Sequence, residues 1–292
     1  MHSAPEISII LPTCDRPTLV GRAVRSVLEQ AGPSFEIILV DANRTTPENV
    51  GEAALAPWRD DPRVRIMNAR GRVNAAAARN VGLAAARGRW VTFLDDDDEY
   101  LPGKLAAQHA LAGQTGAPLV VCGYEFAWPR RVRVRQVEQS EFRGDEILRH
   151  ANLGSPLLFH RRDDGVRFDE GLSAGEDMLY AQQLLWARRQ RVLPCVARAL
   201  VRVHGNAAAN SVHRDKEAVW RAYRATLRVA RHQFSREACR AFLLLGRLER
   251  GIGGYGSTRA FLGTIFAVLR KRGWSEWRLA AYALLARRRR VR

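Results

Sequence analysis

Short apolar runs alternate with amphipathic segments along the N-terminal part of the chain, and each run has a length typical of one secondary-structure element. The β-branched runs 7–12 (ISIILP) and 35–41 (FEIILVD) predict two strands, and their unbroken apolar character predicts burial on both faces of a sheet. Between them, 18–31 (TLVGRAVRSVLEQA) carries apolar residues at helical spacing. These three segments together predict a β-α-β unit.

The same alternation continues up to residue 95. Segment 63–68 (RVRIMN) predicts a third strand, 74–88 (NAAAARNVGLAAARG) an alanine-rich helix capped by its terminal glycine, and 90–95 (WVTFLD) a fourth strand. Strands and helices in alternation predict an α/β fold with a mostly parallel central sheet and flanking helices. Because ligands of such sheets bind outside the carboxyl ends of the strands, residues that directly follow strands are the first candidates for a site.

A run of four aspartates, 95–98, follows the fourth strand, as Asp41 ends the second. Neighbouring carboxylates disfavour one another's ionisation, so the run indicates a cationic partner. Carboxylate oxygens suit Mg²⁺ or Mn²⁺, whereas the competing explanation is a solvated acidic turn that caps a helix starting near Pro102. An EF-hand is excluded, because Tyr100 stands where that loop requires glycine.

Charge divides the chain near residue 213. Residues 1–213 hold 27 Lys and Arg against 25 Asp and Glu, whereas residues 214–292 hold 20 against 5. The second region also becomes helical in pattern, with arginines between apolar residues, so we expect two parts, 1–212 and 213–292. The basic helices either pack on the first part with a solvated face or contact an anionic membrane surface. No nucleic-acid-binding motif accompanies the charge, so specific nucleic-acid binding is not expected.

The lengths of the apolar runs and the spacing of the cysteines indicate the cellular compartment of the protein. No apolar run approaches the roughly 20 residues that span a bilayer, and the N-terminus lacks the basic and apolar segments of a signal peptide. The four cysteines lie far apart without a C-x-x-C pair, which favours a reducing compartment over a disulfide framework. We therefore expect a cytoplasmic protein, with the basic helices as a possible peripheral contact to the inner face of the cell membrane.

Five ordered blocks carry a family resemblance. They are SIILPTCDRP (8–17), EIILVDANRT (36–45), AAARNVGLAAARGRWVTFLDDDDEYLPGKL (76–105), FDEGLSAGEDMLYAQQLL (168–185) and VRVHGNAAANS (201–211). In order and spacing they resemble the family 2 glycosyltransferases, and the resemblance covers roughly residues 5–212. It implies a Rossmann-like GT-A domain with a C-terminal helical extension. It also implies transfer of a sugar from a nucleotide diphospho-sugar to an acceptor hydroxyl, with inversion.

The resemblance assigns residues to the donor. It implies that five residues meet the nucleotide or its phosphates: Pro12, Thr13, Asp41, Arg79 and Asn80. Asp41 corresponds to the aspartate that accepts a hydrogen bond from the nucleobase, and Arg79 supplies a permanent positive charge near the phosphates. Ala42 stands where the family usually has a second acidic residue, which leaves the base selectivity open.

The resemblance also places a divalent cation, Mn²⁺ or Mg²⁺, at the acidic run. Asp95 and Asp97 match the two ends of the D-x-D motif, so Asp97 is expected to ligate the metal and Asp95 to hold the ribose or the metal's water. Asp96 falls between them, which leaves a one-residue ambiguity over which aspartates serve the donor. His204 matches a histidine that reaches the metal or the diphosphate. A cation there would stabilise the leaving diphosphate as a Lewis acid.

Glu176 and Asp177 are the candidate catalytic residues. Asp177 matches the family's general base, which takes the proton of the acceptor hydroxyl, and Glu176 supports it. An ordinary pair of acids in the first turn of a helix is the alternative. The acceptor is expected to be a sugar, a lipid-linked molecule or a small molecule, in the synthesis of cell-surface polysaccharide, glycolipid or a secondary metabolite.

Two other classes of function use a similar fold. A nucleotidyltransferase would have a basic, glycine-rich phosphate loop after the first strand, and LPTCDRPTLVG (11–21) is not one. A non-catalytic nucleotide-sugar-binding protein would have lost the D-x-D motif or the base, and both are present.

Overall fold

The computed structural model describes residues 4–43, 55–69, 71, 74–128, 131–135, 139–150, 153–162, 165–204 and 216–252. The strands are β1 (Ile7–Thr13), β2 (Phe35–Asp41), β3 (Val64–Asn68), β4 (Trp90–Phe93), β5 (Glu99–Tyr100), β6 (Leu119–Trp128), β7 (Arg131–Arg135), β8 (Glu141–Arg143), β9 (Phe159–Arg161) and β10 (Val192–His204). The helices are α1 (Pro17–Leu28), α3 (Ala75–Ala85), α4 (Lys104–Thr115), α5 (Asp145–His150), α6 (Glu176–Ala187), α7 (Lys216–Ala230) and α8 (Arg236–Ile252), with short 3-10 turns η1 (Ala56–Trp58) and η2 (Ser155–Leu157).

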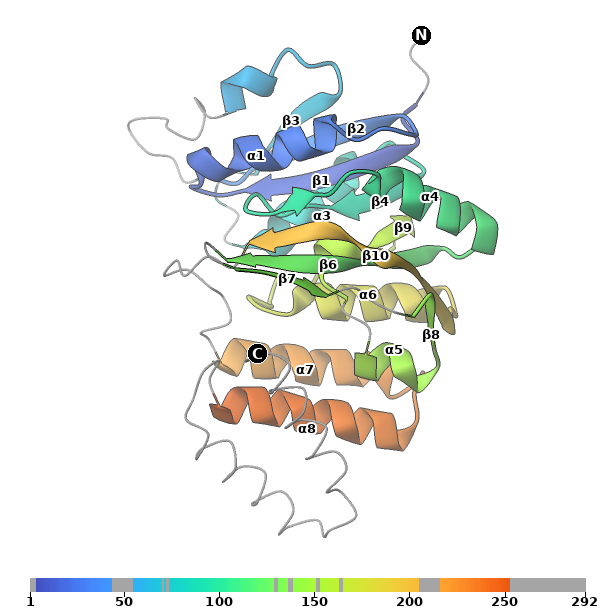
Figure 1. Ribbon diagram of the computed structural model, residues 1–292. Helices are drawn as coiled ribbons and strands as arrows, with labels where there is room; N and C mark the ends of the chain where they lie inside the picture. The colour runs from blue at the N-terminus through green and yellow to red at the C-terminus, as the bar shows by residue number, and fades with distance from the viewer. Residues whose placement is uncertain are drawn as a thin grey trace.

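The strands form one sheet in the order β3-β2-β1-β4-β9-β6-β10-β5, with β7 beside β6 and β8 beside β10 (Figure 1). The first four strands in this order run parallel, and so do β6 and β10, while β9 is antiparallel to both of its neighbours. The predicted α/β fold with a mostly parallel sheet is confirmed. In register, Thr13 lies opposite Asp41, so the carboxyl ends of β1 and β2 meet at one edge of the sheet.

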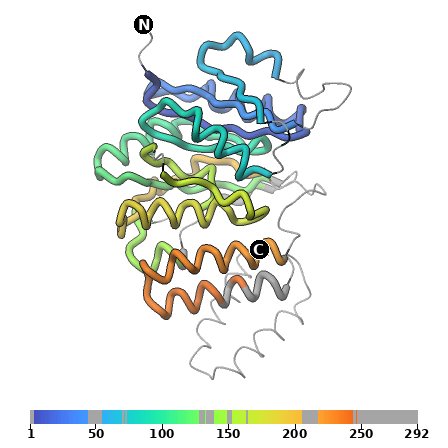
Figure 2. The backbone as a smooth tube through the Cα atoms, turned by 180° about the vertical axis from the view of Figure 1, so that it is seen from behind, coloured from blue at the N-terminus to red at the C-terminus, as the bar shows by residue number. Residues whose placement is uncertain are grey.

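Two hydrophobic cores, one on each face of the sheet, explain why β1 and β2 are apolar along most of their length. Successive strand residues point to opposite faces: Ile10 joins the core that contains residues of α3 and α6, whereas Ile9 and Leu11 join the core that contains residues of α1 and α4. Figures 1 and 2 show these helices covering the sheet from its two sides. The parallel strands are therefore held between helical layers, with their carboxyl ends left for a site.

Two local predictions were wrong. Gly88 does not cap α3, which ends at Ala85; a Cβ atom at Gly88 would lie 2.5 Å from the backbone N of Ser8, so this glycine permits a close approach of two chain segments. The acidic run does not cap the next helix either. The N-cap of α4 is Gly103, with φ 82° and no side-chain cap, so the capping explanation of the aspartates fails.

Helices α7 and α8 form a hairpin against α6 (Figure 1). The boundary expected near residue 212 falls within 205–215, and the basic helical region expected for 213–292 extends beyond residue 252, so the boundary and the last part of that region lie outside the described residues. Throughout the described part of the chain, every helix is too short or too polar to cross a bilayer.

Candidate active site

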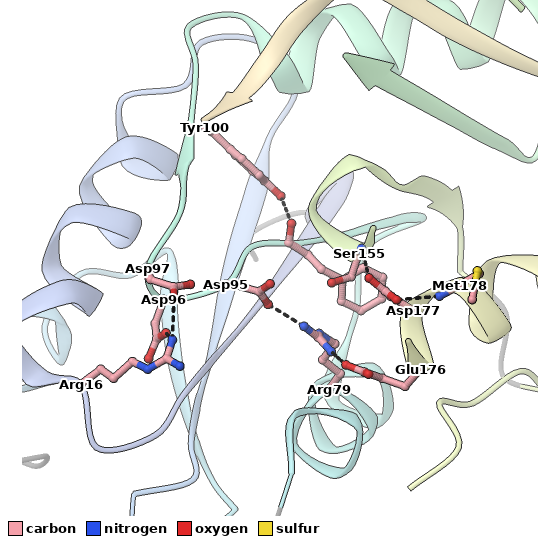
Figure 3. A network of polar contacts seen from close by, with 11 residues as sticks. Arg16, Arg79, Asp95, Asp96, Asp97, Tyr100, Ser155, Glu176, Asp177 and Met178 are labelled. Atoms are coloured by element: carbon pink, nitrogen blue, oxygen red, sulfur yellow. Dashed lines mark hydrogen bonds and ion pairs between the residues drawn. The ribbon is translucent and has the colours of Figure 1, made fainter. Parts of the chain in front are cut away.

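The functional candidates gather at the carboxyl edge of the parallel strands. Thr13 and Asp41 end β1 and β2, and the acidic run follows β4. Glu176 and Asp177 open α6, about 80 residues further along the chain, and reach the same edge (Figure 3). The structure thus brings together the donor, metal and base candidates that the sequence placed in separate blocks.

The acidic run contacts arginine on its α1 side. Nη1 of Arg16, the N-cap residue of α1, lies 3.0 Å from Oδ1 of Asp96 and 2.8 Å from Oδ2 of Asp97. Thr13 Oγ1 donates a hydrogen bond of 2.9 Å to Asp96 Oδ2. Asp96 is buried, and burial raises its pKa to about 6 although Arg16 and Thr13 favour the charged form. Asp96 therefore points into the protein and organises Thr13 and Arg16.

Arg22 and His204 contact the C-terminal end of the acidic run. Arg22 Nη2 donates to the backbone oxygen of Asp97 at 2.5 Å, and its Nε lies 3.1 Å from Glu99 Oε1. Asp98 Oδ1 accepts the backbone N–H of His204 at 3.0 Å, and burial together with Asp95 and Asp97 raises its pKa well above the usual range. His204 Nε2 lies 3.5 Å from Glu99 Oε2. His204 thus sits beside the run, on the Asp98 and Glu99 side.

Arg79 joins the acidic run to the acid pair of α6 (Figure 3). Its Nη2 lies 2.6 Å from Asp95 Oδ1 and its Nη1 lies 2.8 Å from Glu176 Oε1. The side chain is 5% exposed, and its guanidinium lies over the ring of Phe168 at 5.4 Å. Burial alone would lower the pKa of Arg79, but Asp95, Glu176 and Asp177 outweigh it and raise that pKa. One buried cation is therefore shared between two carboxylates from different parts of the chain.

Asp177 lies beside this pair without a bond to Arg79. Its Oδ1 accepts the backbone N–H of Met178 at 2.7 Å, and its Oδ2 accepts the backbone N–H of Ser155 at 3.3 Å. Burial, with Glu176 adding to it, raises the pKa of Asp177 to about 6. A carboxylate with that pKa is ionised near neutral pH yet still accepts a proton readily, which are the requirements for a general base.

The other donor candidates are held by local hydrogen bonds. Asp41 Oδ1 accepts from the backbone N and from Nδ2 of Asn43, at 3.0 and 2.7 Å, and Asn43 Oδ1 accepts the backbone N–H of Asp15 at 2.5 Å. Pro12 is buried within β1. The amide of Asn80 bonds the backbone N and O of Phe168, at 2.9 and 3.0 Å, so it tethers that segment to α3.

The fit of a divalent cation depends on which aspartates are accessible. The side chains of Asp95 and Asp97 are 33% and 26% exposed, against 6% for Asp96. Among the described residues, no three His, Cys, Asp or Glu side chains form a ready-made metal site. Mg²⁺ commonly binds through one or two carboxylates and completes its shell with water and substrate phosphates. The two accessible carboxylates fit that mode of binding.

Comparison with known proteins identifies the family. Residues 8–174 match the family model described as glycosyl transferase family 2. The chain belongs to that family. One relative of this family 2 glycosyltransferase is the succinoglycan biosynthesis protein ExoO of Rhizobium meliloti, 30% identical over 214 residues, which cover 66% of this chain and 60% of ExoO. Another is the GalNAc(5)-diNAcBac-PP-undecaprenol beta-1,3-glucosyltransferase of Campylobacter jejuni, 35% identical over 35% of this chain and 33% of that enzyme. The chain thus spans well under two thirds of these relatives.

A solved structure shares the fold. The structure of residues 1–349 of S. aureus TarS in complex with UDP-GlcNAc superposes with a TM-score of 0.67 at 17% identity, covering 96% of this chain and 79% of TarS in that structure. The likeness supports the GT-A-like architecture, with its mixed, mostly parallel sheet and flanking helices.

Sequence reasoning missed several residues of the site. Arg16 and Arg22 neutralise the acidic run, Asn43 holds Asp41, and the backbone of Ser155 holds Asp177. The position of Arg16 directly after the first strand was a usable signal, because it faces the same sheet edge. No local pattern points to the backbone N–H of Ser155.

Proposed function

We propose that this chain transfers a sugar from a nucleotide diphospho-sugar to an acceptor hydroxyl, with inversion and with a divalent cation, in the synthesis of a bacterial cell-surface polysaccharide. The observation that carries the proposal is the Arg79 bridge, which sets the D-x-D carboxylate Asp95 beside the acid pair that contains the base. The names of ExoO and of the Campylobacter enzyme support the polysaccharide setting, and the TarS complex supports a UDP-sugar donor.

The donor meets the carboxyl ends of β1, β2 and β4. Asp41, held in place by Asn43, accepts a hydrogen bond from the base, next to Pro12 and Thr13. Asp95 and Asp97 hold Mg²⁺ or Mn²⁺, and that cation, when bound, stabilises the negative charge of the departing diphosphate. His204 is assigned to the same metal or diphosphate. Asp96 and Asn80 support the donor site from behind, through Thr13 and Phe168.

The acid pair divides two tasks between its members. Glu176 forms an ion pair of 2.8 Å with Arg79, so its carboxylate is engaged by the guanidinium rather than by the acceptor. Among the described residues, Asp177 accepts hydrogen bonds from two backbone N–H groups, and its pKa is raised, so it takes the proton from the acceptor hydroxyl as the oxygen attacks the anomeric carbon. The diphosphate leaves on the opposite side of that carbon, and a single displacement of this kind inverts its configuration.

The acceptor and the location follow from the same proposal. The acceptor is a sugar or a lipid-linked glycan, in line with the undecaprenol-linked substrate named for the Campylobacter relative. The protein is placed in the cytoplasm, with the basic region 213–292 in peripheral contact with anionic lipid. Specific nucleic-acid binding is not part of the proposal.

A donor screen tests the proposal. UDP-, GDP- and dTDP-sugars are titrated into the protein by calorimetry, with and without Mn²⁺, and release of the nucleoside diphosphate is then measured for each ligand that binds. We expect one nucleotide sugar to bind more tightly with Mn²⁺ and to release its diphosphate. Release of pyrophosphate from a nucleoside triphosphate and a sugar phosphate would instead identify a nucleotidyltransferase. If a donor binds but no nucleoside diphosphate is released, with water or with any glycan as the acceptor, the chain is a non-catalytic binding protein.

A further inference from the structure

The residue before the acid pair rests directly on helix α7. Gly175 is the N-cap of α6, with φ 67°, and a Cβ atom built on it would lie 2.8 Å from the Cβ of Ala222. Side-chain carbons do not approach that closely, so no methyl group fits between the Gly175 backbone and Ala222. Ala222 is 1% exposed and lies on the second turn of α7. The start of α6 is therefore in direct contact with α7.

The residues after the acid pair are also held by α7. The side chain of Met178 packs against the cluster that α7 and α8 form around Tyr223, and its backbone N–H is the 2.7 Å donor to Asp177 Oδ1. Leu179 joins Ala222 and Leu172 in a second small cluster. Glu176 and Asp177 are thus bracketed by residues whose positions α7 determines.

We propose that α7 positions the catalytic acid pair, and that Ala222 is the positioning residue that sets where the α6 N-terminus lies. This proposal rests on the proposed function, because it takes Asp177 as the base and concerns only what positions that residue. A larger residue at position 222 has to displace Gly175, since close-packed interiors leave no room for it. The displacement moves Asp177 away from the Ser155 N–H of η2, which donates to it at 3.3 Å, and away from the acceptor.

Two matched substitutions in α7 test the idea. Ala222→Leu and Ala230→Leu each enlarge a buried alanine of α7, eight residues or about 12 Å apart along the helix. Ala230 packs against the α8 cluster that contains Phe242 and does not contact Gly175. The rate of UDP release from UDP-GlcNAc, or from the donor that the screen selects, is compared with the dissociation constant for UDP.

We expect Ala222→Leu to lower the rate by about tenfold or more, because a displacement of about 1 Å can cost about a hundredfold. The affinity for UDP should stay the same, since among the described residues α7 packs mainly on α6 and α8 rather than on the strands of the donor edge. Ala230→Leu should lower the melting temperature without changing the rate. If Ala222→Leu does not fold, Ala222→Val makes the same test with a smaller step. Equal losses in the two α7 variants, or a normal rate in a folded Ala222 variant, overturn the proposal.

A second measurement needs no substrate. Carboxyl ¹³C NMR follows the titration of Asp177 in the donor-free protein, where the charged groups facing it are Glu176 on α6, Arg79 on α3 and Asp95 after β4. Loss of the Ser155 N–H bond in Ala222→Leu should raise the pKa of Asp177, because that bond favours the charged form, while Ala230→Leu should leave the pKa unchanged. If no nucleotide sugar binds the wild type, the proposed function fails, and this titration still decides the role of Ala222. An unchanged titration in Ala222→Leu contradicts the positioning role.

Discussion

Replacing Arg79 by glutamine removes the buried cation that Asp95 and Glu176 share. Both carboxylates then lose an ion pair, at 2.6 and 2.8 Å, in a site where the Glu176 side chain is only 14% exposed. Removing one partner of a buried ion pair typically destabilises a protein by about 3–5 kcal/mol. Because Asp95 is 33% exposed and keeps part of its hydration, we expect the lower end of that range, about 3 kcal/mol.

The loss should depend on pH in a definite direction. Without Arg79, which favours the charged form of Asp177, the folded-state pKa of Asp177 rises further above its unfolded value. A group with a raised folded pKa contributes stability that is present below its unfolded pKa and lost as pH rises through its folded pKa. The variant should therefore be weakest at neutral and alkaline pH, and it should recover stability as pH falls from about 7 to about 4.5.

Urea unfolding at about pH 7 and about pH 4.5 measures this loss of stability. It is carried out on the wild type, Arg79→Gln and the double variant Arg79→Gln/Glu176→Gln. We expect the double variant to regain part of the stability at neutral pH, because it no longer buries an unpaired Glu176. Arg89→Gln, which changes an exposed arginine outside the site, is the control. An Arg79→Gln protein that is as stable as the wild type at neutral pH, or whose loss is the same at both pH values, would refute the reasoning.

Three further predictions concern the metal, the base and the basic region. Asp97→Asn should weaken Mn²⁺ binding and reduce turnover without changing the melting temperature. The control Asp60→Asn, at an exposed position, should bind Mn²⁺ normally. Unchanged Mn²⁺ binding in Asp97→Asn would show that Asp97 is not a ligand. Turnover should fall below about pH 6 as Asp177 takes up a proton, and Asp177→Asn should lack this acid limb while being more stable than the wild type at neutral pH, because its buried charge is gone; a limb that persists in the variant belongs to another group. Truncation after Ile252 removes ten Lys and Arg and one Glu, so it should reduce binding to anionic vesicles. Raised ionic strength should reduce the binding of the full chain in the same way. Vesicle binding that neither change reduces would argue against a charge-driven contact.

The sequence allowed the central part of the fold to be predicted because burial leaves a local mark. Strands such as β1 and β2 lie between two helical layers and are apolar along most of their length, so their runs stand out. The edge of the sheet that carries the site could also be predicted, because the candidate residues directly follow predicted strands. By contrast, β10 mixes buried residues with arginines such as Arg198 and Arg202, because parts of it are partly exposed, and its pattern gave no strand prediction.

The cations of the acidic run could not be predicted from local pattern. Four adjacent aspartates indicated a positive partner, and the structure supplies Arg16 and Arg79, whose contacts with the run join residues 80 and 16 positions apart in the chain. Glu176 reaches Arg79 across 97 positions. Such pairings depend on how the helices pack on the sheet rather than on spacing, so only the resemblance to the family placed Arg79 and Glu176 in one site, and Arg16 was missed. Their individual roles at the donor and the metal stay predictions.

The most direct test of the central claim compares donor binding with turnover in Asp177→Asn. The substitution keeps the size of the side chain and an oxygen acceptor for the Met178 N–H, but its amide nitrogen faces the Ser155 N–H and it cannot take up the acceptor's proton. The account predicts that calorimetry gives the wild-type affinity for the nucleotide sugar, while transfer falls by about 10²–10⁴-fold, the usual contribution of general-base catalysis. Transfer at the wild-type rate, or a loss of donor binding that accounts for the whole decrease, would contradict it.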